Sequence, residues 1–362
     1  MHKLLPILTI NGSDGTGASG IQADMRAILA MGGYALTALT SVTVQAAAGI
    51  VAFSDFDDEL MLRQVSTLMQ DFGPKTVKVG MVRSPSVMHP LRDRLVGCRH
   101  LVCAPGIIDA HGQRLMDDDA IRAYMRHLLP EAELLVLKCA AAELMTGTTI
   151  TDEASMLSAA RRLLECGPRA VFLRGGHCAE GLVTGLLLDT GDDGRPHFYT
   201  SPNTEGWQLH GVGGTLSAAI AARLAQGDTV VAAVERAHQY LRSQVVYSAE
   251  SVSHSFRQVE LYNRLMELVT SHYATSHDVS FYADRLNVTP RYLAEVTGRV
   301  TGRTPKQLIS DFLTTETEHR LQNRALTIQE VARQLGFASQ AAFAQFFRSQ
   351  RGCSPTEFRE RG

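Results

Sequence analysis

The stretch with the clearest capacity for chemistry is a glycine-rich turn that leads directly into an apolar helix, over residues 211–220. Glycines in such a turn allow a sharp bend and let the backbone come close to a ligand. The amides of the turn and of the helix start point at one spot, which favours an anion and most often a phosphate. We therefore expect an anion to bind at Gly211, Gly213, Gly214 and Thr215. A tight turn without a ligand is the alternative interpretation of this pattern.

A second glycine-rich loop follows the first predicted strand. Residues 4–10 form an apolar run that predicts a buried strand, residues 11–20 form the loop, and a helix is expected from residue 21 to about 31. Ligands of α/β sheets bind at the carboxyl ends of strands, which makes this loop a second candidate site. Its glycines are not spaced as a dinucleotide-binding fold requires.

Two further predicted strands end in residues that suit a flat ligand. The strand at 38–45 ends in Gln45, whose planar amide can donate and accept hydrogen bonds side by side. The strand at 76–81 ends in Met81, a residue type more commonly used in a core. Strands alternate with amphipathic helices up to about residue 245, which predicts an α/β fold with a mostly parallel sheet between helices.

These motifs resemble those of the ribokinase-like vitamin kinases, and most of all the hydroxymethylpyrimidine (phosphate) kinase of thiamine synthesis. The resemblance covers about residues 1–245 and rests on residues 12–14, 20–24, 43–45, 78–81, 174–177 and 210–219. It implies a ribokinase-like fold and an anion hole at residues 211–215. It also implies that Gly12, Asp14, Gln45 and Met81 bind the pyrimidine.

The sequence departs from that family at the positions that serve phosphoryl transfer. Gly214 stands where the family has a Cys that is taken as catalytic. Ala104, Lys138 and Ala141 stand where the family has an Asp, an Asn and a Glu that help to hold magnesium and phosphates. Magnesium takes oxygen ligands. We therefore expect no catalytic residue at this site, no metal site and no cofactor.

The last third of the chain is predicted to be helical throughout. A short, serine-rich segment begins at residue 248, and we expect a linker over 248–262 between domains at 1–247 and 263–362. A short helix at 279–288 precedes Thr289-Pro290, which caps a second helix at 291–299. The same arrangement recurs at 327–337 and 341–348, which predicts two helix-turn-helix units.

This region resembles the all-α DNA-binding domain of the AraC family of transcription regulators, over about residues 263–362. The resemblance rests on 300–305, 336–347 and 350–359 and implies a double-stranded DNA operator as partner. Exposed residues at the starts of the second helices are expected to contact bases, and arginines near their ends to contact phosphates. The expected DNA contacts are Arg291, Tyr292, Glu295, Arg299, Gln340, Ala341, Gln345 and Arg348, with Arg303 and Arg351 as further phosphate contacts.

Composition agrees with a DNA-binding tail on an acidic body. The chain of 362 residues has a net charge of −2, yet residues 281–362 contain 12 Lys and Arg against 8 Asp and Glu. No apolar run reaches about 18 residues, so we expect no membrane span and no signal peptide. The six cysteines form no Cys-x-x-Cys pair, which indicates free thiols in the cytoplasm.

Three functions stay open at this point. In the first, a degenerate kinase-like domain senses hydroxymethylpyrimidine or its phosphate and controls sequence-specific DNA binding, with a homodimer expected. In the second, the chain is an active kinase that uses ATP and magnesium, with Asp24 or Cys139 in place of the missing base. In the third, the ligand is of the pyridoxal type.

Overall fold

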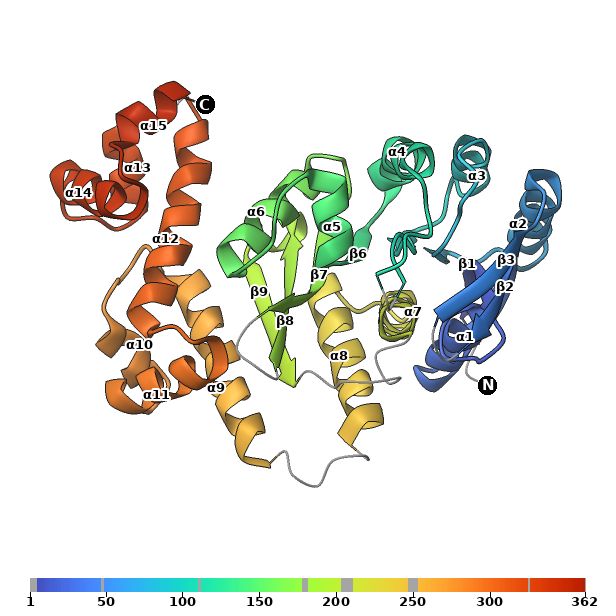
Figure 1. Ribbon diagram of the computed structural model, residues 1–362, viewed down its shortest axis with the longest axis horizontal. Coiled ribbons are helices and arrows are strands. Elements are labelled where there is room, and N and C mark those ends of the chain that lie inside the picture. Colours follow the sequence, from blue (N-terminus) through green and yellow to red (C-terminus); the bar gives the residue numbers. More distant parts are fainter. Residues whose placement is uncertain are drawn as a thin grey trace.

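The computed structural model describes residues 5–46, 49–109, 112–177, 182–202, 211–246, 253–324 and 326–361. It confirms the predicted fold class, because a mostly parallel sheet with helices on both faces precedes an all-helical region (Figure 1). None of the helices in the described residues combines the length and the apolar character that a membrane crossing requires.

In the described residues the strands form one nine-stranded sheet with the order β3-β2-β1-β4-β5-β6-β7-β8-β9. The pairs from β2 to β7 are parallel, whereas β3 at one edge and β8 and β9 at the other run antiparallel to their neighbours. The strands are β1 (Pro6–Asp14), β2 (Tyr34–Ala46), β3 (Gly49–Asp55), β4 (Thr76–Val79), β5 (His100–Cys103), β6 (Leu134–Lys138), β7 (Ala170–His177), β8 (Leu182–Asp189) and β9 (Pro196–Pro202).

Alternation along the buried strands directs side chains to both faces of the sheet. In β1, for example, Leu8 and Ile10 pack with the helices of one face, and Ile7 packs with those of the other. The first face is covered by α2 (Asp58–Phe72), α3 (Met88–Arg94), α4 (Asp118–His127), α5 (Cys139–Thr146) and α6 (Glu153–Leu164). The second is covered by α1 (Gly20–Ala30), α7 (Val212–Ala225) and α8 (Val230–Val246).

The helical region contains the two predicted helix-turn-helix units, joined by one long helix. The first unit is α10 (Val279–Arg285) with α11 (Pro290–Thr301), and the second is α13 (Ile328–Gln334) with α14 (Gln340–Arg351). The long helix α12 (Pro305–Gln322) lies between them, and α15 (Pro355–Arg361) closes the chain. The side chains of Thr289 and Ser339 cap α11 and α14 as the sequence predicts.

The segment predicted as a linker is helical in its second part. Helix α9 spans Ser253–His272 and packs beside the edge strand β9, while residues 247–252 lie outside the described residues. Its buried residues Tyr262, Leu265, Met266 and Val269 have the spacing of one helix face. Asn263 binds the edge strand directly, since its Oδ1 accepts from the Thr200 amide at 2.9 Å and its Nδ2 donates to the Thr200 carbonyl at 3.4 Å.

Candidate functional site

A cavity of about 160 Å³ lies at the carboxyl ends of β1, β4, β6 and β7. The structure brings together there most of the residues that the sequence analysis selected, from six separate places in the chain. Residues lining the cavity include Gly12, Asp14, Gln45, Met81, Ala104, Lys138, Ala141, Gly211, Gly213 and Gly214. Their contacts with a ligand remain predictions.

The glycine turn before α7 packs closely against the first glycine-rich loop. Gly211 is the residue before the helix and has φ of 81°, and a Cβ there would overlap the carbonyl oxygen of Ala18. Only glycine tolerates both the left-handed backbone and this close approach. The amides of residues 212–214, at the start of α7, have no partner within the helix, and Gly213 and Gly214 line the cavity.

Thr215 is the one predicted anion-binding residue that does not line the cavity. Its amide donates to the Gly211 carbonyl at 2.9 Å, so the helix already uses this group. The Ser217 hydroxyl likewise donates to the Gly213 carbonyl at 2.8 Å. Both side chains lie past the first turn of the helix, which leaves the backbone amides of the turn as the candidate anion-binding groups.

Asp14 organises the loop that closes one side of the cavity. Strand β1 extends to Asp14, farther than predicted, and the loop is correspondingly shorter. The Asp14 carboxylate accepts hydrogen bonds from the amides and hydroxyls of Thr16 and Ser19, at 2.7–2.9 Å. Partial burial alone would raise the pKa of Asp14, but these hydrogen bonds lower it to about 2. The carboxylate therefore supports the loop, whatever contact it makes with a ligand.

Gln45 and Met81 both line the cavity. Gln45 pairs with Ile50 of β3, one residue before the end of β2, and within the described residues its side-chain amide makes no hydrogen bond. Met81 is buried, and its amide donates to Asn11 Oδ1 at 3.0 Å. The side-chain amide of Gln45 thus remains available for a polar ligand edge.

A fully buried ion pair lies behind Gly214. Lys78 Nζ donates to Asp24 Oδ2 at 2.6 Å, and Thr9 and Asn11 donate to the same oxygen at 2.6 and 3.0 Å. The other oxygen, Oδ1, is buried and has no hydrogen-bond partner among the described residues. A Cβ added to Gly214 would lie 3.3 Å from Oδ1. Asp24, which the sequence analysis named only as a possible substitute base, is therefore a neighbour of the position that lacks a side chain.

Two cations lie on adjacent strands at this cavity. Lys138 at the end of β6 is the register partner of Arg174 on β7, and both line the cavity. Lys138 Nζ donates to the carbonyl oxygen of Asp109 at 2.8 Å, and the Arg174 guanidinium lies against Gly213. Burial, and next the charge of Arg174, lower the pKa of Lys138 to about 8, whereas Asp109 opposes this shift. Burial lowers the pKa of Arg174 to about 10.

The donor set of the cavity does not fit a magnesium ion. Mg²⁺ takes oxygen ligands in near-octahedral geometry. The positions at which the resemblance places an Asp, an Asn and a Glu present Ala104, Lys138 and Ala141 to the cavity. In the described ranges, no three His, Cys, Asp or Glu side chains are grouped as metal ligands. An ammonium group at Lys138 also repels a divalent cation.

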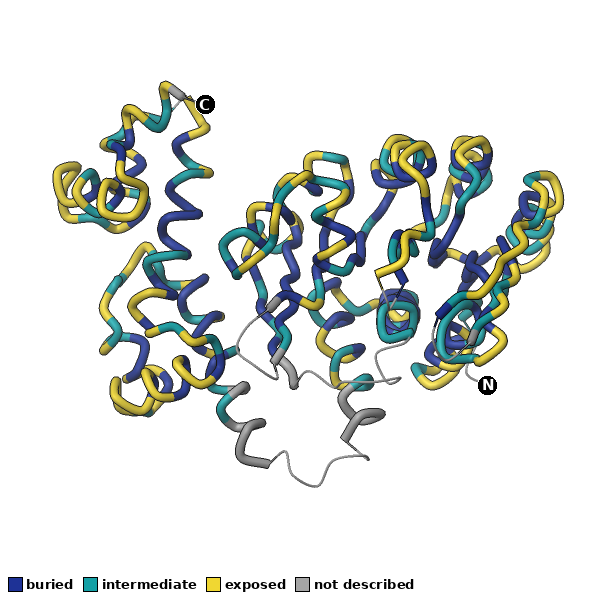
Figure 2. Tube along the Cα trace, in the orientation of Figure 1, coloured by how far each residue is buried: buried dark blue, intermediate teal, exposed yellow. Residues whose placement is uncertain are grey.

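The predicted DNA-reading helices present their expected residues to solvent. Figure 2 shows exposed turns on α11 and α14, near the two ends of α12. All eight selected residues are exposed: Arg291, Tyr292, Glu295, Arg299, Gln340, Ala341, Gln345 and Arg348. Two of them form an ion pair, Arg299 with Glu295, at 2.7 Å. Arg351, expected to bind phosphate, pairs with Glu318 of α12.

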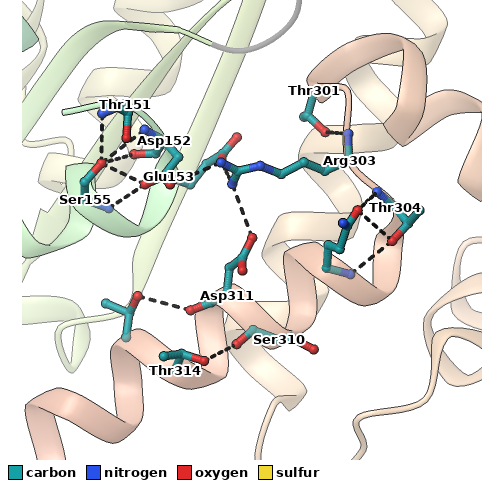
Figure 3. A network of polar contacts seen from close by, with 12 residues as sticks. Thr151, Asp152, Glu153, Ser155, Thr301, Arg303, Thr304, Ser310, Asp311 and Thr314 are labelled. Carbon is teal, nitrogen blue, oxygen red and sulfur yellow. Dashed lines mark hydrogen bonds and ion pairs between the residues drawn. The ribbon is translucent and has the colours of Figure 1, made fainter. Parts of the chain in front are cut away.

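Arg303, also expected to bind phosphate, instead joins the two domains (Figure 3). Its guanidinium donates to Asp152 Oδ2 at 3.1 Å and to Glu153 Oε2 and Asp311 Oδ2, both at 3.3 Å. Asp152 and Glu153 start α6, whereas Asp311 lies on α12. Tyr262 of α9 also donates to Glu153, at 2.8 Å. The periodicity of the sequence does not predict this contact, because Arg303 lies about 150 residues from Asp152 and Glu153 along the chain.

The buried carboxyl of Glu153 depends on these partners. Burial raises the pKa of Glu153, and the hydrogen bond from Tyr262 and the charge of Arg303 oppose the shift. A second ion pair crosses the same interface, between Arg161 of α6 and Glu316 of α12. Helix α6 is therefore held to the long helix of the DNA-binding region at both ends of their contact.

Comparison with known proteins assigns both regions. The model of the phosphomethylpyrimidine kinase family matches residues 14–259, and that of a helix-turn-helix domain matches residues 282–361. The hydroxymethylpyrimidine/phosphomethylpyrimidine kinase of Streptomyces coelicolor is 32% identical over 240 residues, which are 65% of this chain and 86% of that protein. The Rhizobium meliloti protein of the same description is 36% identical over 66% of this chain and 89% of its own length. The phosphomethylpyrimidine kinase of Clostridium difficile 630 superposes with a TM-score of 0.57 at 29% identity, over 67% of this chain and 100% of that one.

Proposed function

Because the chain belongs to the phosphomethylpyrimidine kinase family and ends in an AraC-type helix-turn-helix domain, we propose that it is a ligand-controlled transcription regulator. Its kinase-like domain would bind a thiamine-pathway pyrimidine, either hydroxymethylpyrimidine or its phosphate. Ligand binding would then change the affinity of the C-terminal domain for a DNA operator. A homodimer would read two half-sites.

The observation that carries this proposal is the composition of the cavity. It keeps the glycine turn, Gln45 and Met81, which suit a flat ligand with an anionic group. It has Gly214, Lys138 and Ala141 in place of a base and metal-holding groups. Phosphoryl transfer depends on charge neutralisation and on a positioned base, and each supplies orders of magnitude in rate. Binding requires neither.

A continuous set of contacts supports the coupling of cavity and DNA-binding helices. Helix α5 starts after Lys138 at the cavity, contacts α6, and ends seven residues before Glu153. Helix α6 in turn contacts α12 through Arg303 and Arg161. A ligand alters DNA affinity only if it binds two arrangements of these helices with different affinity.

One observation favours the alternative of an active kinase. The unpartnered Oδ1 of Asp24 lies beside Gly214, near the place where a catalytic side chain would stand. Cys139 is the weaker substitute, because burial raises the pKa of its thiol to about 12. A kinase would also need ATP and magnesium, and the donor set offers poor support for the metal.

Calorimetry of the full chain separates the two functions. The protein is titrated with hydroxymethylpyrimidine, its monophosphate and ATP–magnesium, and ADP release is measured on the same samples. Double-stranded sites selected from random DNA then report operator affinity with and without pyrimidine. The proposal predicts pyrimidine binding without ADP release and a changed operator affinity. Turnover at a rate typical of kinases, about 1–100 per second, would contradict it.

A further inference from the structure

The end of the cavity away from Gln45 is unusually rich in groups that attract anions. Two helices, α5 and α7, begin there, and the first amides of each have no partner within their helix. Lys138 and Arg174 are strand neighbours at the same end. Helix starts and cations favour the same ligand, a group with negative charge.

Arg174 is the key residue, because its charge is not matched among the described residues. No described carboxylate forms an ion pair with its guanidinium, and no hydrogen bond to it is recorded among the described residues. A partly buried cation without a partner is costly unless an anion compensates it. Its position against Gly213 directs that anion to the start of α7.

The acids around the cavity do not supply this anion. Asp24 is paired with Lys78 at 2.6 Å, and the Asp14 carboxylate is held by Thr16 and Ser19. Asp109 accepts from the Gln113 amide at 2.7 Å and lies at the Lys138 side of the cavity. An external anion therefore faces two cations, and among the described residues Asp109 partly offsets the charge of Lys138.

We propose that Lys138 and Arg174 form a phosphate subsite that selects the phosphorylated pyrimidine and holds it without a divalent metal ion. The ammonium group of Lys138 supplies charge at a position where a metal-dependent site would carry a neutral amide. This inference rests on the proposed function, because it specifies the ligand of the same cavity. The ligand class is a phosphate monoester of a flat heteroaromatic alcohol.

The test is calorimetry on the full chain with hydroxymethylpyrimidine, its monophosphate and inorganic phosphate, each in EDTA and in magnesium. We expect the monophosphate to bind in EDTA about tenfold to a hundredfold more tightly than the alcohol, as hydrogen bonds to charged groups imply. Magnesium should change this affinity by less than about twofold. Inorganic phosphate should bind weakly and compete with the monophosphate.

Substitutions at Lys138 and Arg174 test whether these two cations cause the preference for the monophosphate. Lys138→Asn keeps a residue suited to the start of α5 and should lose most of the preference for the monophosphate while the alcohol still binds. Arg174→Met should act similarly, and Arg174→Lys should restore part of the preference. Lys75→Asn, at an exposed lysine outside the cavity, is the matched control and should change nothing. Thermal unfolding confirms that each variant is folded.

The possible failures are distinguishable. Equal binding of both pyrimidines, a preference that needs magnesium, or a preference that survives Lys138→Asn overturns the subsite and leaves the sensor proposal standing. If neither pyrimidine binds, the ligand of the sensor is wrong. In that case phosphate binding that Lys138→Asn abolishes still supports the subsite, and its absence overturns it.

Discussion

The two helix-turn-helix units differ in how they are attached to the ligand-binding domain. The first shares one hydrophobic core with that domain, which runs from Phe198 of β9 through Met266 of α9 to Leu293 and Phe312. The second has a separate core, in which Phe343 and other aromatic side chains pack against α12 and α13. The first unit is therefore packed as part of the larger domain, whereas the second has a core of its own and is joined to the rest through α12.

Two contacts join the second unit to the turn after α9. His277 Nε2 lies 2.9 Å from the carbonyl oxygen of Leu335, and Gly336 lies against the carbonyl of Ala274. Arg320 of α12 also donates to Tyr273 at 2.7 Å. A ligand signal that reaches α12 through α6 would act on both the long helix and this turn.

The largest expected effect comes from the separate core. Phe343→Ala should destabilise the second unit by about 3–5 kcal/mol, because Phe343 is fully buried and its removal leaves a cavity. Hydrogen exchange should accelerate in α13 and α14 while the sheet and pyrimidine binding stay unchanged. Met266→Ala, in the shared core, is the counterpart and should accelerate exchange in α9, α11 and β9 together. If Phe343→Ala accelerated hydrogen exchange in the sheet as much as in α13 and α14, the two cores would be one cooperative unit.

The next effect comes from the contact between α6 and the turn before α12. Arg303→Ala removes three carboxylate contacts and leaves Glu153 with Tyr262 alone. We expect it to lower the free energy of unfolding by about 1–2 kcal/mol, because the guanidinium is partly exposed. Operator affinity should then respond less to the pyrimidine phosphate, while each ligand still binds. Arg122→Ala, which breaks an exposed ion pair with Asp119, is the control. Undiminished coupling in Arg303→Ala would remove this contact from the route.

A pH titration tests the cavity end of the same route, at Lys138. Lys138 has a pKa of about 8, so it is mostly charged below pH 8 and mostly neutral above it. An anion prefers the charged form, and affinity for the monophosphate should fall by up to about tenfold per pH unit above pH 8. Arg174, with a pKa of about 10, stays charged over most of this range, and Asp14, with a pKa of about 2, stays ionised.

Affinity should also fall below about pH 6, where a phosphate monoester takes up its second proton. Lys138→Arg should abolish the fall above pH 8 and keep the one below pH 6. Calorimetry from pH 5.5 to about 9.5 measures both limbs. An upper limb that persists in Lys138→Arg would assign it to a group other than Lys138.

The smallest expected effect separates the two recognition helices on DNA. Arg348 of α14 has no ion-pair partner among the described residues, whereas Arg299 of α11 is paired with Glu295. Arg348→Ala should therefore lower the salt dependence of operator binding by about one phosphate contact, and Arg299→Ala by less. Operator affinity measured from low to high salt tests this difference. A larger loss for Arg299→Ala would show that DNA displaces the Glu295 ion pair.

The sequence predicts local motifs better than the contacts between them. The glycine turn, Gln45 and Met81 were selected from short patterns, and the parallel sheet brings them to one cavity because strand ends converge at one edge. Arg303 carried a plausible prediction as a phosphate contact. Its actual partners, Asp152 and Glu153, belong to another domain, and only the tertiary structure makes them neighbours.

Two other differences between the sequence predictions and the structure have local causes. The linker prediction relied on serines up to residue 255 and ignored the helical spacing of Tyr262, Leu265, Met266 and Val269. Thr215 was selected for its hydroxyl, yet it lies one residue too far into α7, where the backbone amide is already used. The pairing of Lys138 with Arg174 required the strand register and could not be read from spacing alone.

The contact of Asn263 with the last strand has a consequence for protein engineering. A side-chain amide occupies both backbone groups of Thr200 and so closes part of an edge that could otherwise recruit another strand. A kinase-like fragment cut before α9 would expose that edge together with the apolar side chains that α9 covers. Its solubility should suffer, even though the cut leaves the cavity intact. Chimeric sensors made from this protein should therefore exchange sequence after α9, with the helix retained as part of the ligand-binding module.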